Sequence, residues 1–253
     1  MRTLFCIANL NARRFRTNAR HLSNLKAHFP TEGRLFPTRT LEEAGQALDS
    51  VASQRPDTVM ICGGDGTLQA TLDGLSKRYQ GVDLPEIFVV PAGTMNVVFH
   101  HYRKAPRLKR LDFRSIFEAW ANGGGRLEPL PPLAFDGKNG FIFAIGGFSS
   151  FIEWYRESPD PTPWRGASLV LRTGISAILG TGLASGLFTT FCASFDQGVP
   201  SDDGTYVSWS ASSISHIGFG ARPYVDADEV RLGAFWMRAP LRGVAGLPKP
   251  PAA

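Results

Sequence analysis

The chain has 253 residues and a mass of 27.6 kDa, the size of one large domain or two small ones. Apolar residues make up 43% of it and charged residues only 19%, so it can bury a core and is not a disordered polyampholyte. The formal net charge of +5 favours phosphorylated or anionic partners, although ordinary solubility charge would give the same balance.

The three cysteines lie in apolar segments and show no CxxC spacing. This pattern argues against a disulfide framework and a zinc site, and favours a reducing cytosol. The N-terminal apolar segment is too short for a signal peptide and indicates a strand. The longest apolar segment, residues 167–193, is interrupted by Arg172 and by glycines, so we do not expect it to span a membrane.

The first half of the chain alternates short apolar runs with helical periodicity. Strands are predicted at residues 3–8, 57–62 and 86–90, and the continuously apolar run 57–62 is typical of a strand buried on both faces of a parallel sheet. Helical spacing occurs in residues 22–29, 41–51, 67–75 and 112–120, and Thr40 with Glu43 forms a capping box before the second of these. Repeated strand and helix predict an α/β fold with a parallel sheet.

After residue 125 the pattern changes to short strands separated by turn residues. We expect two hairpins, 127–135 with 141–145 and 187–195 with 205–214, and one helix at 167–179. The sequence therefore predicts an α/β domain with a parallel sheet at residues 1–125. A mainly antiparallel β domain is predicted at residues 126–253.

The sharpest local signal is Gly63-Gly64-Asp65-Gly66-Thr67, between a predicted strand and a predicted helix. Glycines at such a junction let the backbone take positive φ and approach a ligand, and the helix N-terminus offers free amides to phosphate. No lysine follows the glycines, so the motif is not a Walker A loop, and it is not the GxGxxG fingerprint. A tight turn without a ligand is the alternative, but this composition is uncommon by chance.

A second glycine-threonine turn, Pro91-Ala92-Gly93-Thr94-Met95-Asn96, follows the next predicted strand. Loops at neighbouring strand ends of an open parallel sheet line the same crevice. We therefore expect the two turns to converge on one ligand.

Together the two motifs resemble the diacylglycerol kinase catalytic-domain family, which includes bacterial lipid kinases and sphingosine kinases. The family's GGDGT is intact at residues 63–67 and its PxGTxN at residues 91–96. Weaker matches are IANLNAR at residues 7–13, a threonine ahead of the 41–51 helix, and FIFAIGGFSSFIE at residues 141–153. The resemblance implies an N-terminal nucleotide domain and a C-terminal antiparallel β sandwich that binds lipid.

The resemblance also implies a reaction, the Mg²⁺-dependent transfer of the γ-phosphoryl group of ATP to a lipid hydroxyl such as that of diacylglycerol. It implies that Asp65 acts on the metal, the nucleotide or the acceptor hydroxyl, and that Asp228 holds a structural metal. The implied nucleotide-binding residues are Asn9, Asn11, Thr38, Thr40, Gly63, Gly64, Gly66, Thr67, Gly93, Thr94 and Asn96. The expected partners are a lipid alcohol and the inner surface of the cytoplasmic membrane, not nucleic acid, and a homodimer is left open.

The sequence departs from the family pattern at several positions. Leu10 and Arg13 replace the Pro and Gly of the first-strand turn, Ala70 and Val97 replace common acidic residues, and no Asp-Gly-Glu triplet follows Val230. Because the family places a catalytic carboxylate in that triplet, either the chain is shortened or its chemistry is impaired. A nucleotide-binding or lipid-binding pseudoenzyme is therefore the second hypothesis. An NAD kinase, which shares GGDGT, is the third.

Overall fold

The computed structural model describes residues 2–102, 112–123, 127–130, 132–135, 138–157, 166, 168–169, 171–173, 175–176, 191–193, 204–215, 224 and 233–238. The chain divides into two compact units, residues 1–140 and residues 141–253. The hairpin that precedes residue 141 thus groups with the first unit.

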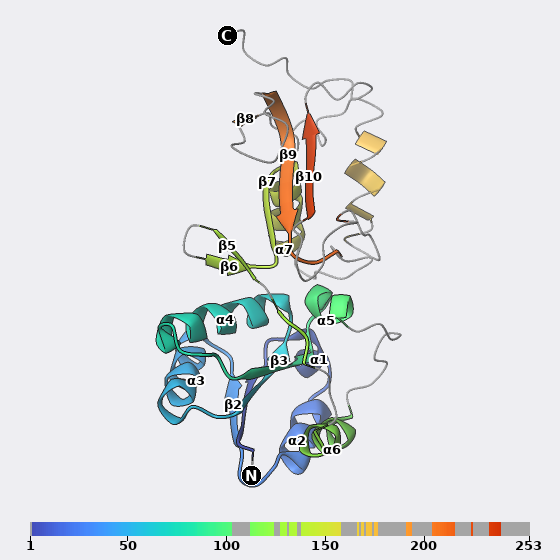
Figure 1. Ribbon diagram of the computed structural model, residues 1–253. Helices are drawn as coiled ribbons and strands as arrows, with labels where there is room; N and C mark the ends of the chain where they lie inside the picture. The colour runs from blue at the N-terminus through green and yellow to red at the C-terminus, as the bar shows by residue number, and fades with distance from the viewer. Residues whose placement is uncertain are drawn as a thin grey trace. The chain divides into compact units, whose positions relative to one another are not determined.

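A four-stranded parallel sheet forms the centre of the first unit (Figure 1). Its strands, in the spatial order β2-β1-β3-β4, are β1 (Leu4–Asn9), β2 (Arg34–Thr38), β3 (Thr58–Gly63) and β4 (Glu86–Pro91). The central strands β1 and β3 are buried along nearly their whole length, as in a sheet covered on both faces. The predicted parallel α/β architecture is confirmed. Strand β2 was not predicted, because it contains Pro37, which is compatible only with an edge position.

Helices cover both faces of this sheet (Figure 1). They are α1 (Arg13–Thr17), α2 (Arg20–His28), α3 (Leu41–Gln54), α4 (Asp65–Tyr79), α5 (Val97–Tyr102) and α6 (Phe113–Ala121). Helices α3 and α4 lie on one face, and α2 and α6 lie on the other. The sequence predicted the four longer helices, whereas α1 and α5 are too short to show a helical repeat.

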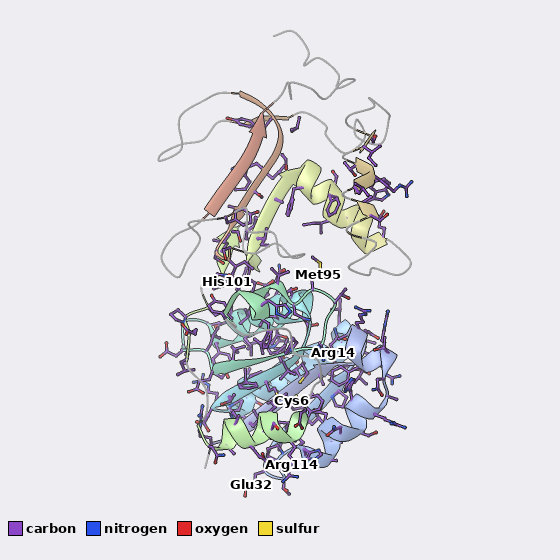
Figure 2. The ribbon with its side chains drawn as sticks, turned by 90° about the vertical axis from the view of Figure 1, so that its right-hand side faces the viewer. Cys6, Arg14, Glu32, Met95, His101 and Arg114 are labelled. Carbon is purple, nitrogen blue, oxygen red and sulfur yellow. The ribbon has the colours of Figure 1, made fainter. Side chains whose placement is uncertain are left out.

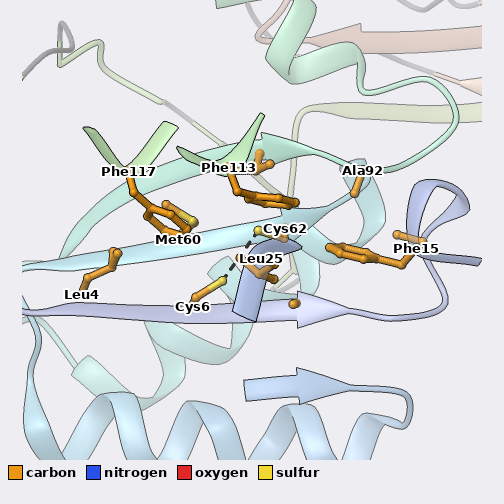
Figure 3. Close-up of a cluster of buried hydrophobic side chains, with 12 residues drawn as sticks. Leu4, Cys6, Phe15, Leu25, Met60, Cys62, Ala92, Phe113 and Phe117 are labelled. Carbon is orange, nitrogen blue, oxygen red and sulfur yellow. Dashed lines mark hydrogen bonds between the residues drawn. The ribbon is translucent and has the colours of Figure 1, made fainter. Parts of the chain in front are cut away.

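Alternate residues of β1 and β3 form the core beneath α2 and α6 (Figure 3). Cys6 and Met60 pack there with Phe113 and Phe117, whose ring centroids are 6.3 Å apart. The Sγ atoms of Cys6 and Cys62 lie 3.6 Å apart as free thiols. Burial raises the pKa of the Cys6 thiol, so this side chain is neutral and acts as a small apolar packing residue.

The start of α3 has the predicted capping box. The Thr40 hydroxyl accepts the Glu43 N–H at 3.1 Å, and the Glu43 carboxylate accepts the Thr40 N–H at 3.3 Å. Helix α3 then packs against α4, and the Arg78 guanidinium of α4 donates to the Asp49 carboxylate of α3 at 2.7 Å. These contacts hold α4, whose first turn contains the last three residues of the GGDGT motif.

A short antiparallel hairpin of β5 (Leu133–Phe135) and β6 (Lys138–Gly140) ends the first unit. The Asp73 carboxylate of α4 accepts the Asn139 N–H at 2.8 Å and so attaches the hairpin to that helix. The prediction that residues 127–135 pair with 141–145 was wrong. Strand β6 follows β5 after only two residues and takes the position of its partner.

The second unit contains an antiparallel sheet in the order β10-β9-β7. Its strands are β7 (Ile142–Gly146), β9 (Gly204–Ser212) and β10 (Gly233–Arg238), and β8 (Phe191–Ala193) also pairs with β9. The β8–β9 pairing confirms the second predicted hairpin. The antiparallel character of this unit is thus observed, whereas the sandwich remains a prediction.

Helix α7 (Gly147–Glu157) follows β7 directly and was not predicted. Its first turn is capped by Ser208 of β9, whose hydroxyl accepts the Phe148 N–H at 3.2 Å. The spacing of Phe148, Phe151 and Ile152 could have indicated this helix, but the preceding glycines suggested a loop. The described residues within 166–176 are helical, in agreement with the predicted helix at 167–179. Among all described residues, no helix is both long and apolar enough to cross a membrane.

Two glycines on facing helices provide a test of the α3–α4 packing. A Cβ added at Gly45 of α3 meets no atom within 4 Å, whereas one added at Gly74 of α4 collides with Cδ1 of the buried Leu48. Gly45→Ala should therefore stabilise the protein by about 0.5–1 kcal/mol through helix propensity. The free energy of unfolding of Gly74→Ala should be about 1–3 kcal/mol lower than that of Gly45→Ala because of overpacking, as measured by urea unfolding. Equal gains from both substitutions would contradict this packing.

Candidate functional site

All four parallel strands of the first unit end at one edge, and the candidate residues follow these ends. In the sheet register, Asn9 of β1 is beside Thr38 of β2, and Gly63 of β3 is beside Pro91 of β4. Figure 2 shows Met95, just beyond β4, at this end of the unit, and Glu32 at the opposite end. The carboxyl edge of the sheet, where open α/β sheets bind ligands, therefore contains both glycine-threonine turns.

The two turns are in direct contact through their backbones. The Gly63 carbonyl accepts two hydrogen bonds, from the Ala92 N–H at 2.8 Å and the Gly93 N–H at 3.1 Å. A Cβ added at Gly93 would lie only 2.5 Å from the Cα of Gly64. The two turns are thus adjacent, as their positions in the sequence predicted, and Gly93 has no room for a side chain. A ligand shared by both turns remains a prediction.

The expectation that the glycines of these turns take positive φ was wrong. Gly63, Gly64, Gly66 and Gly93 all have negative φ, and the left-handed residue is Asn96, with φ of 49°. At Gly63 the constraint is steric, because a Cβ there would lie 2.5 Å from Cβ of Thr67. Gly66 is different, since a Cβ there would meet nothing within 4 Å. The fold therefore excludes a side chain at Gly63 and Gly93 and leaves little room for one at Gly64, where a Cβ would lie 3.1 Å from the Gly93 Cα, whereas Gly66 is left without a structural reason.

The buried Asn96 shapes the second turn. Its Oδ1 accepts the Gly93 N–H at 2.9 Å, and its Nδ2 donates to the Gly93 carbonyl at 3.0 Å. Asparagine is one of the few residues that tolerate the left-handed conformation. Both polar ends of the side chain are engaged within the turn, so Asn96 orients the loop, and Thr94 lies at the tip that it closes.

Asp65 connects the two turns. It is the first residue of α4, and its Oδ1 accepts the Val98 N–H at the start of α5 at 3.0 Å. A carboxylate has two oxygens, and only one is needed for this cap. The geometry therefore fixes the direction of the carboxylate and leaves Oδ2 for a metal ion or a proton.

Two asparagines at the end of β1 contact residues that follow the neighbouring strands. Asn9 Nδ2 donates to Thr67 Oγ1 at 2.9 Å, and Asn9 Oδ1 accepts the Asn11 N–H at 2.9 Å. Asn11 Nδ2 donates to the Arg39 carbonyl at 2.6 Å. Asn9 is therefore brought to the GGDGT motif, whereas Asn11 is joined to the segment after β2.

The two threonines near the end of β2 have local partners. Thr38 is buried, and its hydroxyl donates to the Ala8 carbonyl at 3.4 Å. The hydroxyl of Thr40 accepts the Glu43 N–H in the helix cap. A contact of either side chain with nucleotide remains a prediction. Asp228, the predicted metal ligand, lies outside the described residues.

Basic side chains lie beside this edge, on α1. The Arg14 N–H donates to the Ala92 carbonyl at 3.0 Å, which holds the start of α1 against the end of β4. Burial, and then the nearby charge of Arg13, lower the pKa of the Arg14 guanidinium. The positive charge of Arg13 and Arg14 near this edge suits an anionic ligand. The family resemblance did not mark Arg14, but the sequence places it in a basic run with Arg13, Arg16 and Arg20, which suits ATP or anionic headgroups as well as an ordinary solubilising surface.

Comparison with known proteins confirms the resemblance that the two motifs indicated. Residues 3–123 match the family model of the diacylglycerol kinase catalytic domain. A crystal structure of a diacylglycerol kinase from Bacillus anthracis str. Sterne is 19% identical, with a TM-score of 0.59, and the match covers 94% of this chain and 74% of that chain. A second structure, described as a putative diacylglycerol kinase from the same organism, is 16% identical, with a TM-score of 0.63 and the same coverage. Such identities establish a shared fold. No curated protein matches the sequence.

The glycine contact between the turns can be tested by stability measurements. Gly93→Ala places a methyl group against the Gly64 backbone and should destabilise the protein by about 1–3 kcal/mol. Gly66→Ala adds its methyl group in open space, two positions after Gly64, and should change stability by less than about 0.5 kcal/mol. Chemical denaturation of both variants measures the difference. A Gly93→Ala protein as stable as Gly66→Ala would show that the turns do not touch in this way.

Proposed function

We propose that this chain transfers the γ-phosphoryl group of ATP to the hydroxyl of a lipid such as diacylglycerol. The observation that supports it most is the backbone contact between the GGDGT and PAGTMN turns at the carboxyl edge of the sheet. Both turns lie within the segment that matches the catalytic-domain model. On the basis of the family resemblance we also propose that the acceptor is a lipid and that the chain contacts the inner membrane surface.

The residues at this edge fit the phosphates of a nucleotide. The first turn of α4 has backbone N–H groups without intrahelical partners, and the open space around Gly66 lets a ligand approach them. The Thr67 hydroxyl lies in the same turn, and Thr94 lies at the tip of the facing turn. Hydrogen bonds from such groups to charged phosphate oxygens are stronger than neutral ones.

The same edge offers one carboxylate for a magnesium ion. Mg²⁺ in phosphotransferases is held by one or two carboxylates together with substrate phosphates, and Asp65 Oδ2 supplies one such oxygen. Within the described residues, no group of three or more His, Cys, Asp or Glu side chains forms a metal site by itself. When bound, the ion neutralises charge on the phosphates. Asp65 is therefore the residue of this edge that fits a metal or accepts the proton of the acceptor hydroxyl.

A pseudoenzyme that binds Mg-ATP without transferring phosphate is the alternative. It is favoured by Ala70, an exposed α4 residue where the family commonly has Glu. A general base contributes about a hundredfold or more to such reactions. Calorimetry with Mg-ATP together with a lipid-kinase assay distinguishes the enzyme from the pseudoenzyme. Both should bind Mg-ATP, but only the enzyme transfers label from γ-labelled ATP to lipid. An NAD kinase would instead label NAD in the same assay.

We predict that Gly66 is required for nucleotide binding and not for folding. In Gly66→Val the added side chain stands in the open space where phosphate would approach, so Mg-ATP affinity should fall by about tenfold or more. Gly45→Val is the matched control, because it places the same side chain in open space on a helix away from the site. Isothermal calorimetry gives the affinities and thermal melting reports the fold. Undiminished affinity in a folded Gly66→Val protein would refute the phosphate-binding role of the turn.

We predict that Asp65 is needed for transfer more than for stability. Asp65→Asn keeps an oxygen that can accept the Val98 N–H, so the fold should be retained while transfer of label from γ-labelled ATP to extracted lipid is lost. Asp65→Ala also loses the cap, and should in addition be destabilised by about 1 kcal/mol. If Asp65→Asn transferred label as fast as the unchanged chain, Asp65 would serve only as a cap.

A further inference from the structure

The orientation of the Asn9 side-chain amide is fixed by its neighbours. A backbone N–H can only donate, so the Asn11 N–H, at 2.9 Å, identifies the atom facing it as Oδ1. The opposite atom is then Nδ2, which donates to Thr67 Oγ1 at 2.9 Å. The Thr67 hydroxyl is therefore the acceptor in this pair, and its own proton points elsewhere.

The helix does not offer this proton its usual partner. A threonine inside a helix commonly donates to the carbonyl four residues earlier, which for Thr67 is that of Gly63. The Gly63 carbonyl already accepts the Ala92 N–H and a share of the Gly93 N–H, which also donates to Asn96 Oδ1. The carbonyl three residues earlier, that of Gly64, accepts the Thr67 and Leu68 N–H groups. The contact that joins the two turns thus leaves the Thr67 proton available to a ligand.

The Thr67 side chain is also held in place sterically. It packs over the bare Cα of Gly63, where an added Cβ would come within 2.5–2.7 Å of the Thr67 side-chain atoms. Thr67 is only partly buried, so its hydroxyl remains accessible at the strand edge. A fixed side chain and an engaged acceptor lone pair together produce a directed donor at the first turn of α4.

We propose that Asn9 is a positioning residue that makes the Thr67 hydroxyl a hydrogen-bond donor to a phosphate oxygen of the nucleotide. The inference rests on the proposed nucleotide-binding function and assigns Asn9 a role different from direct contact with the ligand. Phosphate oxygens only accept hydrogen bonds at neutral pH, so a hydroxyl that presents its proton suits them. Asn9, 58 positions earlier in the chain, sets this direction from the neighbouring strand.

A double-mutant cycle on Mg-ATP binding tests the proposal with the full chain. Asn9→Ala removes the amide, and Thr67→Val replaces the hydroxyl by a methyl group of similar shape. Thr67→Val should weaken Mg-ATP binding by about tenfold in calorimetry, the value of one hydrogen bond to a charged group, and Asn9→Ala, which leaves the hydroxyl in place but free to rotate, should weaken it by a smaller factor. The double variant should bind no more weakly than Thr67→Val alone, because Asn9 acts through the hydroxyl. Additive losses would overturn the proposal, since Asn9 would then act independently of Thr67.

Two conservative variants keep the test independent of folding. Asn9→Asp retains the shape and the bond from the Asn11 N–H, but it puts an acceptor where Nδ2 donates, so the Thr67 proton turns toward it. Affinity should fall further than in Asn9→Ala, while Thr67→Ser, which keeps the hydroxyl, should stay within about threefold of the unchanged chain. The effect of the added negative charge on Mg-ATP affinity is measured separately, by introducing Asn9→Asp into the Thr67→Val variant. An equal loss in that background would refute the role of the hydroxyl.

The outcome also separates this inference from the proposed function. An unchanged chain that fails to bind Mg-ATP overturns both. An unchanged chain that binds Mg-ATP, combined with additive losses in the cycle, overturns only the role of Asn9. Melting temperatures of all variants confirm that affinities are compared between folded proteins.

Discussion

The contact between the backbones of Gly64 and Gly93 determines the geometry of the whole candidate site. With no side chain on either residue, the loops after β3 and β4 approach closely enough for the Gly63 carbonyl to accept two N–H groups from the other turn. Helices α4 and α5 both start from this point, so Asp65 of one can cap the other at Val98. The position of the proposed catalytic carboxylate therefore depends on a contact made entirely by main-chain atoms.

Helix α4 extends this organisation away from the edge. Its first residue caps α5, and Asp73, two turns later, accepts the Asn139 N–H of the β5–β6 hairpin. On the opposite side, Arg78 ties the helix to Asp49 of α3. The helix is thus fixed at its start, its middle and its end, so its first turn can offer N–H groups to a ligand without rearranging. Such pre-organisation reduces the cost of ordering the site when a ligand binds.

Local patterns in the sequence predicted much of the first unit, while nonlocal contacts could not be read from it. The apolar run 57–62 was sufficient to predict a buried strand, and the Thr40 capping box was sufficient to predict the start of a helix, because each signal lies within a few residues. Pairing is different: residues 141–145 were assigned to the nearer hairpin, but β7 pairs with β9, 62 to 70 positions away. The glycines were singled out for the wrong physical reason, since Gly63 is constrained by the Thr67 side chain and Gly64 and Gly93 by each other, and none of them has positive φ.

The Asn9 to Thr67 hydrogen bond shows why an altered first-strand turn need not remove the site. Leu10 and Arg13 replace residues typical of the family, yet the end of β1 still places Asn9 beside Thr67, because the parallel pairing of β1 with β3 sets that distance. The same Gly63 carbonyl that joins the two glycine turns denies Thr67 an internal acceptor. The Gly63 carbonyl thus contributes both to the fold and to the proposed chemistry of the edge. It fixes the loops, and it leaves a hydroxyl proton whose natural acceptor is an anionic ligand.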